Sequence, residues 1–132
     1  MEKQTKIIDA SIVVKWFVDE ENSKKALDIR NDHINGNIKI IVPDLTFIEV
    51  LNALKYKGKT EEDLKEANKD LWDIQLQIIK TTSFTLNKAI EIALKHDITL
   101  YDALYISLST IYGCPLITAD KKLADLPNVQ LI

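Results

Sequence analysis

Four acidic residues stand apart from the other acids of this sequence because apolar residues lie on both sides of each. Most of the twenty Asp and Glu residues fall in charged stretches such as 19–22 and 61–66, which are typical of a solvated surface. The four exceptions are Asp9, Glu49, Asp102 and Asp120. If they converge, their mutual repulsion requires cations or protons to offset it. Carboxylate oxygens without a His or Cys cluster suit hard ions, so the pattern predicts a site for Mg²⁺ or Mn²⁺.

Asp9 and Asp120 each stand at the end of an apolar run that predicts a β-strand. Asp9 directly follows "KII", and Asp120 follows "PLITA". Ser11 stands two residues after Asp9, and Thr118 stands two residues before the other acid. Asp9 could instead cap the helix that follows it, and Ser11 could cap that helix in its place or hydrogen-bond the carboxylate. Asp125 is a fifth candidate acid, with the end of a short helix as its alternative explanation.

Glu49 and Asp102 lie instead within predicted helices. Glu49 falls in "LTFIEVLNAL", where Thr46, Glu49 and Asn52 form a small polar stripe along an otherwise apolar helix. A narrow solvent-facing stripe is the alternative explanation. Asp102 falls in "LYDALYISLSTIYG" and stands three residues after Thr99, which matches a capping box. A carboxylate there also suits the helix dipole, so Asp102 alone does not distinguish a cap from a functional group.

Strand-like and helix-like segments alternate along the chain and would position these acids. Apolar, β-branched runs predict strands at 6–8, 38–42, 114–118 and 129–132, and 76–81 is a fifth candidate that could equally end a helix. Helical patterns cover 11–18, 22–34, 44–57, 61–75, 85–96, 100–112 and 120–125, with Asp44 as the N-cap of the third and a capping box at 60–63 before the fourth. The alternation predicts an α/β fold, a three-layer α/β/α sandwich around a mainly parallel central sheet of about five strands. In such sheets the site lies outside the carboxyl ends of the strands, which is where the four acids would meet.

Length and composition favour one domain over residues 1–132. The 132 residues include 46% hydrophobic and 28% charged side chains, and no apolar run is long enough to span a membrane. The first residues lack the apolar segment of a signal peptide, and the lone Cys114 excludes an internal disulfide, so we expect a cytoplasmic protein. The net charge of −3, with Arg30 as the only Arg, argues against a bulk binder of nucleic acid. It does not exclude a nuclease in which bound divalent ions make the local charge of the site positive.

The four acidic segments, taken in order, resemble the motifs of a known enzyme family. "IIDASIVVKWF", "FIEVLNAL", "LYDALYISLS" and "LITADKKLA" are similar to the four acidic motifs of the PIN-domain ribonucleases, and most similar to those of the small VapC-type toxins of prokaryotic toxin–antitoxin pairs. The resemblance extends from about Lys6 to the C-terminus. It implies a divalent-metal-dependent endoribonuclease that acts on RNA, forms a homodimer and is inhibited by a small antitoxin, whose C-terminal segment enters the active-site groove.

The resemblance also implies roles for individual residues. Asp9, Glu49, Asp102 and Asp120 match the family's acidic quartet, Ser11 and Thr118 match hydroxyl positions that orient the acids, and Asn52 matches a polar neighbour of the Glu. In the mechanism we expect, Asp9 and Asp102 hold a first Mg²⁺ or Mn²⁺, and Asp120 completes that site or bridges to a second ion. Glu49 then positions the attacking water or acts as its base.

Lysines that closely follow the acidic motifs are candidates for contacts with the RNA backbone. They are Lys15, Lys121 and Lys122, and a solvated surface is the competing explanation for each. A second small basic run, at 55–59, follows the helix that carries Glu49.

Other protein classes fit the pattern less well. A receiver domain needs an adjacent acidic pair after the first strand, where "IIDAS" has one acid. A phosphatase of the haloacid dehalogenase type needs a second Asp two residues after Asp9, where Ser11 stands. Two alternatives remain open: a structure-specific DNA nuclease with the same metal chemistry, and a catalytically silent PIN-like protein that only binds a partner. The complete acidic quartet favours activity.

Overall fold

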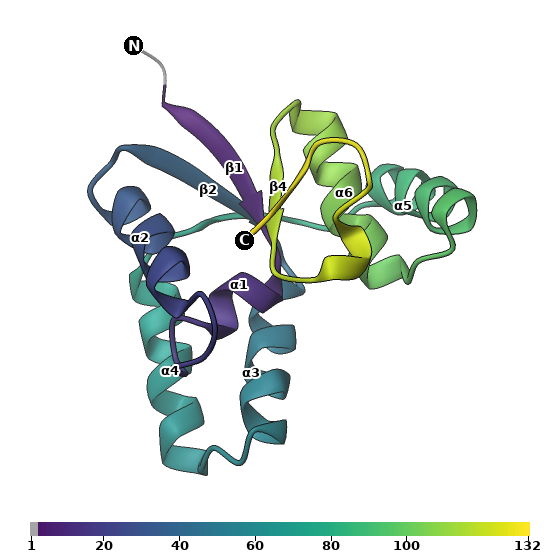
Figure 1. Cartoon of the computed structure of the whole chain (residues 1–132). Coiled ribbons are helices and arrows are strands. Elements are labelled where there is room, and N and C mark those ends of the chain that lie inside the picture. The colour runs from purple at the N-terminus through teal and green to yellow at the C-terminus, as the bar shows by residue number, and fades with distance from the viewer. Residues whose placement is uncertain (1–2) are drawn as a thin grey trace.

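A parallel β-sheet lies at the centre of the molecule, with helices on both of its faces (Figure 1). The structure, a computed structural model, describes residues 3–132, and residues 1–2 of the predicted domain lie outside the described residues. Its strands are β1 (Gln4–Ile8), β2 (Ile38–Pro43), β3 (Gln77–Ile79), β4 (Leu116–Thr118) and β5 (Val129–Leu131). Its helices are α1 (Ala10–Val14), α2 (Ser23–Ile34), α3 (Thr46–Tyr56), α4 (Glu61–Asp73), α5 (Ser83–His96), α6 (Leu100–Tyr112) and the 3-10 helix η1 (Lys121–Leu123). The predicted three-layer α/β/α sandwich is confirmed, and the candidate strand at 76–81 is β3.

The order of the strands determines where a site can form. The strands pair in the order β3-β2-β1-β4-β5, and every pair in the described chain is parallel. The chain builds outward from β1 through β2 and β3, and it then returns to place β4 on the other side of β1. The side on which successive strands are added therefore switches between β1 and β4. Open α/β sheets bind their ligands at the carboxyl ends of the two strands beside such a switch point. In Figure 1 these two strands run side by side and end near α1.

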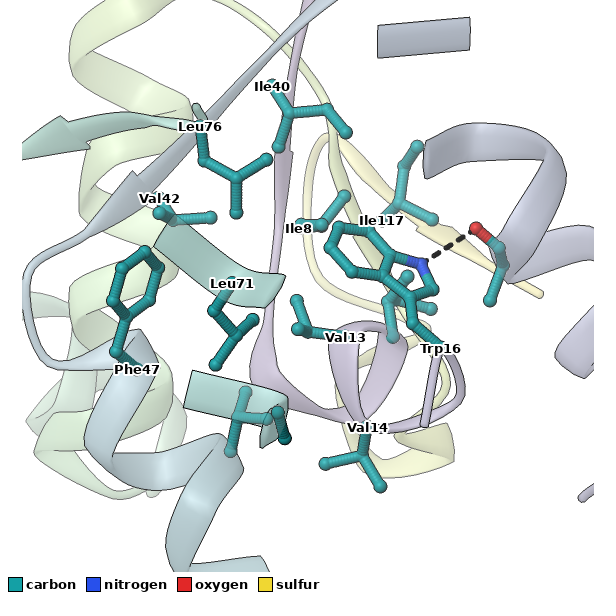
Figure 2. Close-up of a cluster of buried hydrophobic side chains, with 14 of the residues drawn as sticks. Ile8, Val13, Val14, Trp16, Ile40, Val42, Phe47, Leu71, Leu76 and Ile117 are labelled. Carbon is teal, nitrogen blue, oxygen red and sulfur yellow. Dashed lines mark hydrogen bonds between the residues drawn. The ribbon is translucent and has the colours of Figure 1, made fainter. Parts of the chain in front are cut away.

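Alternate residues of the central strands point into two separate apolar cores. Ile8, together with Ile40 and Val42 of β2, packs against helices α1 to α4 in one core, part of which Figure 2 shows. Ile7 and Ile41 point to the opposite face and pack against α6. Because both faces are covered there, the last two residues of β1 and most of β2 are apolar, which is the pattern that predicted these strands.

The short segments next to the sheet differ from their predicted lengths. The helix predicted at 11–18 ends at Val14, and Trp16 follows it into the first core, where Nε1 donates to the Ala26 carbonyl at 2.8 Å (Figure 2). The helix predicted at 120–125 is the single 3-10 turn η1. Within residues 3–132, every helix is too short or too polar to cross a lipid bilayer.

Asp44 does not cap α3, so this prediction was wrong. The helix begins at Thr46, with Leu45 at the N-cap position and no side-chain cap. The Asp44 carboxylate instead accepts hydrogen bonds from the backbone N–H and the Oγ1 of Thr81, at 3.0 and 2.6 Å. Asp44 therefore ties the end of β2 to the loop after β3. The sequence could not distinguish these roles because Thr81 is 37 residues away along the chain.

Candidate acidic active site

Asp9 lies directly beyond the end of β1 and is only 5% exposed. It is the N-cap of α1, and its Oδ1 accepts from the backbone N–H of Ser11 at 3.1 Å and from the Ser11 hydroxyl. Its Oδ2 accepts from the hydroxyl of Thr118. Burial is the main cause that raises the pKa of the Asp9 carboxyl, the hydroxyl hydrogen bonds oppose it, and the charge of Asp102 raises it further. Asp9 is thus both a helix cap and a buried carboxylate close to another acid.

The hydroxyls of Ser11 and Thr118 join the ends of the two strands beside the switch point. Thr118 Oγ1 accepts from the backbone N–H of Asp120 at 3.0 Å, and Ser11 Oγ accepts from the backbone N–H of Ala119 at 3.0 Å. Each hydroxyl therefore donates to Asp9 while it holds the backbone that carries Asp120. The Asp120 Oδ1 in turn accepts from the backbone N–H of Lys122 at 3.0 Å and caps η1.

Asp102 lies in the first turn of α6, and the predicted capping box there is only half formed. Thr99 Oγ1 accepts from the backbone N–H of Asp102 at 3.1 Å, but the two side chains do not complete a reciprocal box. Partial burial and the charge of Asp120 raise the pKa of the Asp102 carboxyl, and the Thr99 hydroxyl and Lys122 lower it by less. The Asp102 carboxylate is therefore not required by the cap, and it lies within electrostatic reach of Asp120.

Glu49 approaches the same region from α3. Its Oε1 accepts from the hydroxyl of Tyr105 at 2.7 Å. Partial burial raises the pKa of the Glu49 carboxyl, the Tyr105 hydrogen bond lowers it, and the charges of Asp9 and Asp102 raise it again. The polar stripe predicted on this helix is not a solvent-facing stripe, because Thr46 is fully buried while Asn52 is exposed.

The candidate lysines differ in their availability to a ligand. Lys15 is buried, and its Nζ donates to Glu20 Oε1 at 3.2 Å and to the Glu21 carbonyl at 2.6 Å. Because its ammonium is already bonded within the protein, Lys15 is a weaker candidate for a contact with the RNA backbone than the sequence suggested. Lys121 and Lys122 are exposed on η1, beside Asp120. Asp125 is also exposed, in the turn after η1.

Comparison with known proteins identifies the family. The family model of the PIN domain matches residues 6–129. The chain belongs to the PIN-domain family. Ribonuclease VapC3 of Pyrobaculum aerophilum is 30% identical to it over 125 residues, which cover 90% of this chain and 92% of that relative. The resemblance that the four acidic motifs indicate is confirmed.

Two solved structures share the fold of this PIN domain at low sequence identity. VapC20 of Mycobacterium tuberculosis, described as a Sarcin-Ricin loop cleaving toxin, superposes with a TM-score of 0.75 at 12% identity, over 96% of this chain and 98% of the other. A chain of a toxin–antitoxin complex from Klebsiella pneumoniae superposes with a TM-score of 0.71 at 18% identity, over 94% of each chain. At these identities the likeness shows the fold alone.

The four acids of this PIN domain offer the oxygen donors that a hard cation prefers. Their side chains are not yet arranged as a complete set of ligands. In residues 3–132, Asp120 alone of the four forms an ion pair, with Lys122 at 3.9 Å. Asp9, Glu49 and Asp102 form no ion pair in this range, and all-oxygen donors suit Mg²⁺ or Mn²⁺. In the same described range, no three His, Cys, Asp or Glu side chains are grouped closely enough to ligate one ion. The donor types fit such an ion, and ligation would require side-chain movement.

Tyr105 belongs to this site and was not among the residues selected from the sequence. It stands three residues after Asp102 on α6, so both side chains emerge on the same side of that helix. This three-residue spacing from Asp102 is visible in the sequence and could have indicated Tyr105. The partner of Tyr105, Glu49, is 56 residues away and is brought to it only by the packing of α3 and α6.

Proposed function

We propose that this PIN domain is an endoribonuclease and the toxin of a toxin–antitoxin pair. The observation that carries the proposal is the buried Asp9 at the point where the strand order reverses, within electrostatic reach of Asp102 and Glu49. The 30% identity to Ribonuclease VapC3 over nearly the whole chain supports RNA as the substrate. The name of the Klebsiella pneumoniae neighbour supports an antitoxin as the partner.

The proposed cofactor is Mg²⁺ or Mn²⁺. Asp9, Asp102 and Asp120 would hold it, because these three carboxylates come from the two strand ends and the helix that meet at one edge of the sheet. When bound, a divalent ion supplies stabilisation of the negative charge that develops on the phosphoryl oxygens. Ser11 and Thr118 orient the Asp9 carboxylate by donating one hydrogen bond to each of its oxygens.

Glu49 is the proposed proton acceptor for the attacking water. Its carboxylate is partly buried, and burial raises its pKa from the ordinary value, which makes it a stronger base than a fully solvated Glu. Asn52, one turn further along α3, is exposed and free to bind the RNA chain near Glu49. Lys121 and Lys122 are the proposed contacts with the phosphates on the other side of the acids.

The proposed assembly is a homodimer that a small antitoxin inhibits. Exposed apolar side chains on α5, namely Phe84, Ile90 and Leu94, are a surface that a second subunit would cover. Sedimentation of the purified chain, alone and with its co-expressed antitoxin, tests this assembly. A monomer at all concentrations would contradict the dimer.

A cleavage assay with matched RNA and DNA substrates tests the proposed function. The purified chain is incubated with single-stranded and hairpin substrates of one sequence in both chemistries, with Mg²⁺, with Mn²⁺ and with a chelator. We expect internal cleavage of RNA that requires the metal. Cleavage of DNA hairpins alone would favour a structure-specific DNA nuclease, and cleavage of neither with retained antitoxin binding would favour a catalytically silent protein.

A further inference from the structure

Tyr105 connects the two helical layers of the molecule at the acidic site. Its side chain is 1% exposed and packs in the core between the sheet and α6. Its hydroxyl donates to Glu49 Oε1 at 2.7 Å and lies 2.9 Å from the Oγ1 of Thr46. In the described part of the chain, the side-chain hydrogen bonds between α3 and α6 both pass through this hydroxyl.

The chemistry of the three groups fixes the direction of both hydrogen bonds. An ionised carboxylate only accepts, so the single proton of the phenol must be donated to Glu49. The Thr46 hydroxyl, which is fully buried, must then donate its own proton to the phenol oxygen. The result is a directed chain from Thr46 through Tyr105 to Glu49. Burial of the phenol keeps its proton in place, since burial and the neighbouring Glu49 charge both raise the pKa of Tyr105 well above its usual value.

The two helices that this hydroxyl joins each carry an acid of the site. Thr46 and Glu49 are three residues apart on α3, and Asp102 and Tyr105 are three residues apart on α6. A hydrogen bond between Tyr105 and Glu49 therefore sets the distance of the Glu49 carboxylate from the helix turn that carries Asp102. In the described chain, the hydroxyl of Tyr105 is the one side-chain donor to that carboxylate.

We infer that Tyr105 is a positioning residue for cleavage: its hydroxyl, oriented by Thr46, holds the Glu49 carboxylate in the orientation in which it accepts a proton from the attacking water. The inference rests on the proposed function, in which Glu49 is that proton acceptor. It assigns to Tyr105 no contact with RNA or with a metal ion. The residue acts only through Glu49.

The variant Tyr105→Phe tests the inference because it keeps the ring and removes the hydroxyl. We expect kcat for RNA to fall by about ten- to a hundredfold, the effect of losing a hydrogen bond to a charged group, with KM changed by less than about twofold. Tyr112→Phe is the matched control, because it removes a hydroxyl from a 45% exposed tyrosine at the far end of the same helix. We expect the control to retain the wild-type kcat and KM.

A double-mutant cycle separates positioning from a general effect on packing. Glu49→Asp keeps a carboxylate but shortens it out of reach of the phenol, so adding Tyr105→Phe to it should lower kcat by no more than about twofold. Thr46→Val, which removes the donor to the phenol, should lower kcat in the wild-type background and have little effect in the Tyr105→Phe background. Circular dichroism at the assay temperature checks that each variant is folded, and calorimetric titration with Mn²⁺ should give the wild-type affinity for Tyr105→Phe.

Several results would overturn the inference. One is a wild-type kcat for Tyr105→Phe. Another is a loss of kcat on adding Tyr105→Phe to Glu49→Asp that equals its loss in the wild-type background. A third is Mn²⁺ binding by Tyr105→Phe that is weakened tenfold or more. A wild-type chain and a Tyr112→Phe control that cleave no RNA would overturn the proposed function and the inference together. A cleaving wild type with an unaffected Tyr105→Phe would overturn the inference alone.

Discussion

Replacing Asp9 by Asn should stabilise the metal-free protein at neutral pH, although it changes a residue at the centre of the site. The two side chains have nearly the same shape, and Asn caps helices as well as Asp, so α1 keeps its cap. The substitution removes a buried negative charge that interacts unfavourably with the charges of Asp102 and Glu49. The hydroxyl of Thr118 can rotate to accept from the new amide.

The sign of the effect follows from the raised pKa of Asp9. Burial is the largest cause of that shift, and a carboxyl whose pKa is higher in the folded state binds its proton more tightly there than in the unfolded chain. Its contribution to stability is therefore complete below the unfolded pKa and is lost as the pH rises through the folded pKa. Removing a buried charge that no ion pair offsets changes the free energy of unfolding by on the order of 1 kcal/mol, so we expect a gain of about that size for Asp9→Asn near pH 7. This gain corresponds to a midpoint increase of about 3–5 °C for a domain of this size.

Thermal unfolding followed by circular dichroism, with a chelator present and at several values between about pH 4 and 8, measures this effect. The advantage of Asp9→Asn over wild type should grow as the pH rises through the raised pKa of Asp9, and it should be smallest at the acidic end of this range. Adding Mg²⁺ should raise the midpoint of wild type and leave the variant unchanged, because ligand binding stabilises only the form that binds. A variant less stable than wild type at pH 8 in chelator, or a difference independent of pH, would refute the reasoning.

Two further substitutions test the support and the surroundings of the acids. Thr118→Val removes the donor to Asp9 Oδ2 and the acceptor of the Asp120 N–H, so it should lower the free energy of unfolding by about 1–3 kcal/mol and also lower kcat, as thermal unfolding and initial rates would measure. Lys121→Gln and Lys122→Gln should each raise KM for RNA with little change in kcat, and each should reduce the slope of log KM against log salt concentration by about 0.7, the value for one phosphate contact on a single strand.

Matched variants serve as controls for these two predictions. Thr118→Ser keeps the hydroxyl and should retain most of the activity, so a loss equal to that of Thr118→Val would contradict the hydrogen-bonding role. Lys24→Gln changes an exposed lysine on α2 that pairs with Asp28, and it should leave KM and its salt dependence unchanged. An equal effect of Lys24→Gln would indicate that only net charge matters.

The layers of the fold could be predicted from local patterns because the physical causes are local. Nearly continuous apolar runs at 38–42 and 114–118 predict strands covered on both faces, and β2 (Ile38–Pro43) and β4 (Leu116–Thr118) lie there. The capping box predicted at 60–63 forms with both of its hydrogen bonds, since Thr60 and Asp63 need only one helical turn to meet. The acids at strand ends share one edge because all the described strand pairs are parallel.

The supporting contacts of the site could not be predicted, because each joins segments far apart in the chain. Thr118 and Asp9 are 109 residues apart, and the hydrogen bond between them exists only because β1 and β4 are neighbours. The Tyr105–Glu49 contact needs α3 and α6 to meet around the edge of the sheet. The burial of Lys15 likewise depends on Glu20, in the loop before α2, which has no strand or helix pattern to locate it.

The rate of RNA cleavage by Asp102→Asn, compared with wild type, tests the central claim most directly. The cap of α6 uses the backbone N–H of Asp102 and not its carboxylate, so the substitution removes charge from the acidic site without breaking that hydrogen bond. The account predicts a loss of about a thousandfold or more in kcat with Mg²⁺, because losing several kcal/mol of charge stabilisation has an effect of that size. The thermal midpoint measured in chelator should stay within a few degrees of wild type. Cleavage at the wild-type rate by a folded Asp102→Asn protein would contradict the claim that the acidic residues form the active site.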